Sequence, residues 1–320
     1  MKTPWFLVLG LLFIFSCSTE QQADVALRNT RIIDADAEDN PDPFIYILGI
    51  AQDAGIPQLA CTKLCCKERR HEKVSSIGIV DPKNESSYLL DATPDLVPQW
   101  KALDSLSGEP SSVEAIFLTH AHIGHYTGLM YLGKEALGAD QLSVFAMPRM
   151  KKFLENNGPW SQLVQEKNIA IKPMDTAKTI LLSRQLKLQP ILVPHRDEYS
   201  ETVGFFIEGP SKSALFIPDI DKWGRWDQDI IAWIKKVDYA ILDATFYDGE
   251  ELNNRDMSEI PHPFLVESMA LFNVLDEKDR NKVYFTHFNH TNPVLTQAEI
   301  KKEVERKGYR IAEEGMVLPL

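Results

Sequence analysis

The chain has 320 residues, of which 44% are hydrophobic, and a formal net charge of −12. This length and composition suffice to bury one large core or two small ones. The acidic balance excludes nucleic-acid binding driven by the neutralisation of phosphates.

Residues 1–17 have the layout of a secretory signal. Lys2 supplies a positive charge, residues 5–15 are apolar, and Ser16 and Cys17 follow. The apolar stretch is shorter than the roughly 20 residues that a membrane-spanning helix needs. Its end resembles a bacterial lipoprotein signal, in which Cys17 carries the lipid, and ordinary secretion is the alternative. We therefore expect an exported protein of the bacterial cell envelope that contacts the membrane only through a lipid anchor.

Residues 18–42 are polar and acidic and predict a flexible tether. The remainder, 43–320, contains no segment polar enough to divide it, and we expect a single domain. Two series of strands, interspersed with helices, predict two sheets packed face to face in an α/β (α+β) domain with helices outside. The expected strands are 44–48, 76–80, 87–90, 113–118, 143–146, 169–173, 178–182, 186–193, 202–208, 214–217, 239–242 and 282–285. The expected helices are 95–103, one from about 126, 150–156, 227–235, 263–274 and 297–307.

Three histidines follow the apolar run 115–118 at spacings i, i+2 and i+5, namely His120, His122 and His125. Imidazole is a common protein ligand for zinc and for iron. A tight turn after a buried strand lets all three side chains converge. A solvated, histidine-rich turn is the alternative, but the spacing favours a metal site.

This segment resembles the His-x-His-x-Asp-His signature of the metallo-β-lactamase superfamily, with Gly124 in place of the Asp. The resemblance implies a four-layered αββα sandwich and later ligands at the ends of strands. It implies that one metal is held by His120, His122 and His195, that a second faces His125 and His287, and that Asp219 bridges them, with Asp221 as its competitor. Because Gly124 removes a charged ligand, we expect one tight divalent metal (Zn, Mn or Fe) and a second that is weak or missing.

Three further cysteines, Cys61, Cys65 and Cys66, lie within six residues. Thiols spaced so closely predict three corners of a tetrahedral metal site. A disulfide plus one free thiol, or three reduced thiols, are the alternatives. Segments 48–57 and 286–293 resemble pyrroloquinoline quinone biosynthesis protein B and the cyclic phosphodiesterase of the carbon–phosphorus lyase pathway. That resemblance implies that His290 completes a structural zinc site.

Four other residues have candidate roles. The phosphodiesterase resemblance places a general acid at His262, whose alternative role is that of a surface histidine at a helix N-terminus. Asp91 and Asp243 each end a predicted strand in an Asp-Ala-Thr sequence. We expect their carboxylates to orient the metal ligands or to cap loops rather than to bind the metal themselves. His71 is expected in solvent, or as a spare ligand for the cysteine site.

Together these features predict a metal-dependent hydrolase that acts on a small molecule, a phosphodiester or a related ester, with Asp219 and His262 as its catalytic groups. An iron-dependent oxidoreductase similar to the quinone-biosynthesis protein is one alternative. A non-catalytic binding module on the same fold is another. The sequence indicates no oligomeric state.

Overall fold

The computed structural model describes residues 42–67, 71–107, 113–196, 198–252 and 256–320. The predicted signal 1–17, Cys17 and all but the last residue of the predicted tether lie outside them. The described residues form one compact unit. Within the described part of the chain, no helix combines the length and apolar character required to cross a membrane.

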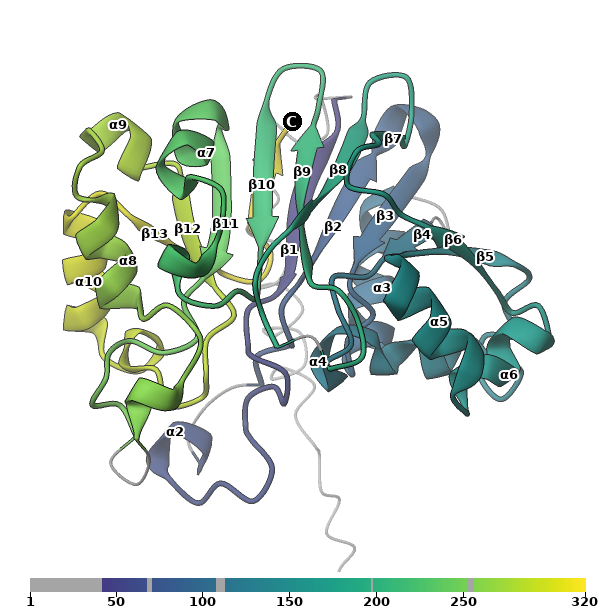
Figure 1. Ribbon diagram of the computed structural model, residues 1–320, viewed down its shortest axis with the longest axis horizontal. Helices are drawn as coiled ribbons and strands as arrows, with labels where there is room; N and C mark the ends of the chain where they lie inside the picture. Colours follow the sequence, from purple (N-terminus) through teal and green to yellow (C-terminus); the bar gives the residue numbers. More distant parts are fainter. Residues whose placement is uncertain (1–41, 68–70, 108–112, 197, 253–255) are drawn as a thin grey trace, which may run out of the picture. The chain divides into compact units, whose positions relative to one another are not determined.

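Two seven-stranded sheets form the centre of this unit (Figure 1). The first has, in spatial order, β14 (Val317–Pro319), β1 (Phe44–Gly49), β2 (Ser76–Asp81), β3 (Ser86–Leu90), β4 (Val113–Phe117), β5 (Leu142–Ala146) and β6 (Ile169–Pro173). The second has β13 (Arg310–Ile311), β12 (Val283–Thr286), β11 (Tyr239–Asp243), β10 (Ser213–Ile217), β9 (Val203–Glu208), β8 (Lys187–Leu192) and β7 (Ile180–Leu181). Strands β3 to β6 are mutually parallel, as are β10 to β13, and the other pairs are antiparallel.

Helices cover the outer face of each sheet (Figure 1). The first sheet is flanked by α3 (Leu96–Ser107), α5 (Pro148–Asn156) and α6 (Trp160–Gln165), and the second by α7 (Ile230–Lys236), α8 (Leu265–Phe272), α9 (Glu277–Arg280) and α10 (Ala298–Arg306). Two further short helices, α2 (Leu64–Lys67) and α4 (Ile123–Tyr126), lie in loops, and 3-10 turns occupy Pro82–Asn84, Thr127–Leu132, Trp223–Arg225, Met257–Glu259 and Pro293–Leu295. The prediction of a four-layered αββα sandwich is confirmed.

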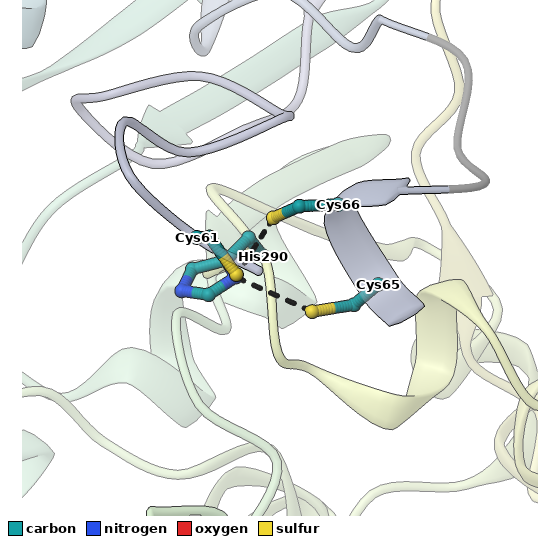
Figure 2. Close-up of side chains that lie close together, drawn as sticks. All are labelled: Cys61, Cys65, Cys66 and His290. Atoms are coloured by element: carbon teal, nitrogen blue, oxygen red, sulfur yellow. Dashed lines mark hydrogen bonds between the residues drawn. The ribbon is translucent and has the colours of Figure 1, made fainter. Parts of the chain in front are cut away.

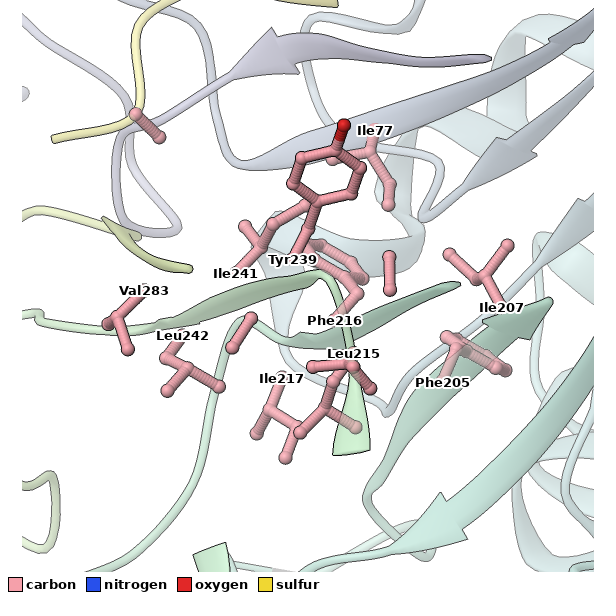
Figure 3. Packing of buried hydrophobic residues seen from close by; sticks show 14 of the residues in the cluster. Ile77, Phe205, Ile207, Leu215, Phe216, Ile217, Tyr239, Ile241, Leu242 and Val283 are labelled. Atoms are coloured by element: carbon pink, nitrogen blue, oxygen red, sulfur yellow. The ribbon is translucent and has the colours of Figure 1, made fainter. Parts of the chain in front are cut away.

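Strand β4 illustrates how the layers are held. Ala115 and Phe117 pack into the core between the sheets, whereas Ile116 and Leu118 pack into the core beneath the helices. Alternate residues of a strand face opposite sides, so a strand covered on both sides is mostly apolar, and in β4 only Glu114 is exposed. Figure 3 shows the inter-sheet core, where Ile77 of the first sheet lies over side chains of the second. This buried strand fixes the position of the histidine turn that follows it.

Several expected elements differ from the structure. Helix α3 ends at Ser107 instead of 103, and α7 begins at Ile230 instead of 227. The helix expected from 126 is a single α turn followed by the 3-10 turn Thr127–Leu132. The strand expected at 178–182 is reduced to the two residues of β7. The expected strand 186–193 is shorter by one residue at each end, as β8.

Candidate metal centre

The predicted metal ligands gather at one edge of the sandwich, beyond the carboxyl ends of the parallel strands. This is where open sheets collect their sites, because neighbouring parallel strands end together there. The residues that end β3, β4, β10, β11 and β12 or follow them within three residues, and that line this edge, are Asp91, His120, Asp219, Asp243 and His287.

The first group brings together His120, His122, His195 and Asp219. Nε2 of His120 lies 2.8 Å from Nδ1 of His122, which in turn lies 3.3 Å from Nε2 of His195. The Asp219 carboxylate lies 3.3 Å from His120 and 3.2 Å from His195. One potential ligand atom from each residue lies within 4.8 Å of the others, which suits a single cation.

The second group brings His125 and His287 to the other side of Asp219. Nε2 of each ring lies 3.8 Å from Oδ2 of Asp219. A fourth member, Asp53, was not predicted, and its Oδ1 lies 3.2 Å from Nε2 of His125. One feature of the sequence could have indicated Asp53 as a ligand. Gly124 stands where the signature has Asp, while an aspartate occupies the loop after the first strand.

Asp91 and Thr119 orient the histidines that follow β4. Asp91 accepts hydrogen bonds from the Thr119 backbone N–H (2.8 Å) and hydroxyl (2.9 Å), and it lies 2.7 Å from Nδ1 of His125. The Thr119 hydroxyl lies 2.9 Å from Nδ1 of His120. Each ring is thereby fixed through one nitrogen, and its Nε2 faces the metal group.

Asp243 and Thr245 have the same role beside β12. The Thr245 hydroxyl donates to Asp243 (2.7 Å) and lies 2.9 Å from Nδ1 of His287. His287 and Asp91 also share a left-handed backbone, with φ of 63° and 69°. Non-glycine residues adopt this conformation at a cost, which the surrounding hydrogen bonds offset.

His262 is buried beside Asp219, which removes the alternative of a surface histidine. Its Nδ1 lies 2.9 Å from Asp243 and 3.2 Å from Asp219. Burial opposes protonation, but these two carboxylates raise the pKa of His262 above its ordinary value.

Asp221, the competitor of Asp219, lies outside both groups. Its Oδ1 lies 3.2 Å from Nδ1 of His195, and its Oδ2 accepts a hydrogen bond from Arg225 at 2.8 Å. It therefore orients a ligand, whereas Asp219 occupies the centre.

Two central groups, Asp219 and His120, have protonation states that suit a cation. Burial alone would raise the pKa of Asp219, but His195, His262 and His287 hold it well below its ordinary value, so this buried group is a carboxylate. Burial, together with repulsion from a neighbouring imidazole, holds the pKa of His120 well below its ordinary value. Its ring is therefore neutral, which is the form that binds metal. Burial opposes protonation of His195 and His125, but nearby carboxylates raise the pKa of His195 to about 10 and that of His125 well above its ordinary value, so a cation would displace a proton from each ring.

Hydrogen bonding provides an independent test of the fit. Buried polar atoms are almost always paired, and an unpaired one demands an explanation such as an ion. Among the described residues, unpaired buried atoms include Oδ1 of Asp53, Nε2 of His125, Oδ1 of Asp219 and Nε2 of His287. The atoms of Asp53, His125 and His287 belong to the second group, whereas Oδ1 of Asp219 lies 3.2 Å from Nε2 of His195 in the first group. The residues present therefore fit a divalent cation in the second group, with Asp219 between the two.

The three cysteines and His290 form a separate group (Figure 2). Nδ1 of His290 lies 3.4 Å from the Cys65 sulfur and 3.3 Å from the Cys66 sulfur. The three thiols are free, so the structure contains no disulfide among them. Three thiolates and one imidazole are a donor set typical of structural zinc. His71 lies apart from this group, with Nε2 3.6 Å from Asp95.

Comparisons with known proteins agree with this geometry. The Beta-lactamase superfamily domain matches residues 87–288. Coenzyme PQQ synthesis protein B of Cupriavidus taiwanensis is 24% identical over 309 residues, covering 86% of this chain and 99% of that protein. The crystal structure of Zn²⁺-bound PqqB from Methylobacterium extorquens has a TM-score of 0.72 at 23% identity and covers 87% of this chain and 100% of its own. A diphosphatase from the PhnP family has a TM-score of 0.60 at 20% identity, with coverage of 87% and 98%. The chain therefore belongs to the beta-lactamase superfamily and has its metal-binding αββα fold.

Proposed function

We propose that this protein is a metal-dependent hydrolase of small phosphodiesters or related esters. The observation that carries the proposal is the buried Asp219 carboxylate, shared by two groups of histidines. A carboxylate has two oxygens and can contact two cations, whereas a structural site needs only a closed set of ligands around one.

His120, His122 and His195 would hold one ion, His125 and His287 a second, and Asp219 both. Divalent ions held there would lower the pKa of a bound water molecule to about 7 and polarise the substrate. His262 would act as the general acid. Because Asp243 engages its Nδ1, the other ring nitrogen is available to protonate the leaving oxygen.

Two considerations favour phosphoesters over lactams and thioesters. A pair of cations neutralises the charge on a non-bridging phosphate oxygen. A diphosphatase from the PhnP family shares the fold, and the segments around the cysteines and His290 resemble a cyclic phosphodiesterase.

The proposal is tested by turnover of a panel of phosphodiester, ester and lactam substrates. We expect phosphodiester hydrolysis that is lost on chelation and regained with Zn²⁺ or Mn²⁺. His262→Asn should lower kcat, least for substrates whose leaving group needs no proton. Activity no higher than the metal ions alone across the whole panel would refute the proposal.

A second candidate is an iron-dependent oxidoreductase. It is favoured by the similarity to coenzyme PQQ synthesis protein B over 86% of this chain, and a histidine-rich site also suits iron. Protein purified without oxygen would then contain iron at the histidine site and would consume O₂. Zinc at that site and no O₂ uptake would exclude it.

A further inference from the structure

Gly124 has no side chain, and Asp53 occupies the space that a side chain at position 124 would need. A Cβ atom on residue 124 would lie 2.5 Å from both Cα and Oδ1 of Asp53, closer than non-bonded atoms approach. Any side chain at position 124 would therefore displace Asp53. Conversely, the Asp53 carboxylate lies where a side chain of residue 124 would begin.

The Asp53 carboxylate also faces the right partners. Its Oδ1 is buried without a hydrogen-bond partner, as is Nε2 of both His125 and His287, and the two rings are fully buried. Burying such atoms without hydrogen bonds destabilises the folded state, and a cation among them would offset this.

The loop that carries Asp53 is fixed to the segment that carries His287. The Gln52 backbone N–H donates to the Phe288 carbonyl at 2.9 Å, and the Phe288 N–H donates to the Ile50 carbonyl at 2.8 Å. Two backbone hydrogen bonds thus set the spacing of Asp53 and His287.

We propose that Asp53 is a ligand of the second metal ion, in place of the signature aspartate that Gly124 lacks, and that Gly124 is required because Asp53 needs its space. The inference rests on the metal centre of the proposed function. It replaces the expectation that the second ion is weak or missing. A divalent cation would have a complete site of two imidazoles and two carboxylates, from His125, His287, Asp53 and Asp219. The second ion should therefore bind tightly.

The test is metal counting and competitive chelator titration of the full chain with Zn²⁺. Wild type should bind two ions beyond the one held by the cysteines. Asp53→Ala and the similarly shaped Asp53→Asn should weaken one of them by about 100-fold or more, since losing even an indirect partner of a ligand costs 10–100-fold. Asp140→Ala, which removes an exposed carboxylate, is the matched control and should bind as wild type does.

Gly124→Ala should also weaken the second ion, although it removes no ligand. The exchange variant, Asp53→Gly with Gly124→Asp, should recover most of the lost affinity. Circular dichroism establishes that each variant is folded. If wild type binds two ions and Asp53→Asn binds both with unchanged affinity, the inference is wrong and the proposed function stands. If wild type binds no ion beyond the cysteine zinc, both are wrong.

Discussion

Replacing Cys66 with Ser should release the segment that carries the cysteines. Between residues 57 and 67, all of them described, Cys66 is the only buried side chain, and the apolar Leu59 and Leu64 are exposed. Little hydrophobic burial holds this segment in place. A metal bound to the three thiols and His290 would therefore be its main anchor.

The size of the effect follows from linkage. A ligand present at about 100 times its Kd stabilises the folded state by about 2.7 kcal/mol. In a domain of this size each kcal/mol corresponds to about 2–4 °C in Tm. Losing the ion should therefore lower Tm by about 5–11 °C at that zinc concentration.

Loss of the cysteine-bound ion should also affect the catalytic centre, but only its second metal site. Asp53 lies eight residues before Cys61, and His287 lies three residues before His290. Both of these proposed second-site ligands are attached to segments that the cysteine site joins, whereas His120 and His122 are not. We expect Cys66→Ser to weaken the second ion and leave the first nearly unchanged.

Calorimetry, zinc counting and chelator titration measure these effects together. His71→Ala is the matched control, because His71 is an exposed neighbour that contacts Asp95 and not the thiols. A Cys66→Ser protein that melts with wild type and keeps its zinc would show that the cysteine site does not exist.

Four further results are expected. His120→Ala should abolish turnover while leaving the Tm of metal-depleted protein nearly unchanged, as calorimetry after chelation would measure. Asp91→Asn should weaken zinc binding about 10–100-fold in a chelator titration, because an amide cannot accept every hydrogen bond that this carboxylate accepts. Burial raises the pKa of Glu251, so ionisation of its carboxylate destabilises the folded state as pH rises above about 4.5. Denaturant titrations from pH 4.5 to 7 should therefore show Glu251→Gln becoming more stable relative to wild type as pH rises. The exposed Glu250→Gln should show no such change. Cys17→Ala should move the protein from the membrane fraction to the soluble fraction, and an unchanged distribution would argue against a lipid anchor.

Elements whose faces are both buried were the most predictable from sequence. Strand β11 is an apolar run ended by Asp243, and β4 and β10 are apolar apart from Glu114 and Ser213. All three lie within one residue of the expected bounds. Strand β14 could not be predicted, because its three residues become a strand only by pairing with β1, more than 260 residues earlier in the sequence. Helix α6 was missed although Trp160, Leu163 and Val164 have helical spacing, because six residues are too few for periodicity to distinguish a helix from a turn.

The residues of the candidate site also differ in how far the sequence could predict them. His120, His122 and His125 could be predicted because their spacing is local, and the ligands after later strands were implied by the superfamily resemblance together with their order along the chain. Asp53 was not visible, because its role depends on a contact with Gly124, 71 residues away, that only the fold creates. The roles of Thr119 and Thr245 likewise depend on distances that spacing does not contain.

Moving a metal ligand from the turn after β4 to the loop after β1 has a structural consequence. In the signature, the acidic ligand and three histidines share one turn, and a buried strand positions them together. Asp53 instead belongs to a loop whose side chains are partly exposed, so its position must be fixed in another way. The hydrogen bonds between Gln52, Phe288 and Ile50 provide part of that support, and the group of Cys61, Cys65, Cys66 and His290 joins the same two segments farther along. A structural zinc there would restore the rigidity that a metal ligand requires, which makes the cysteine site a condition for a tight second ion.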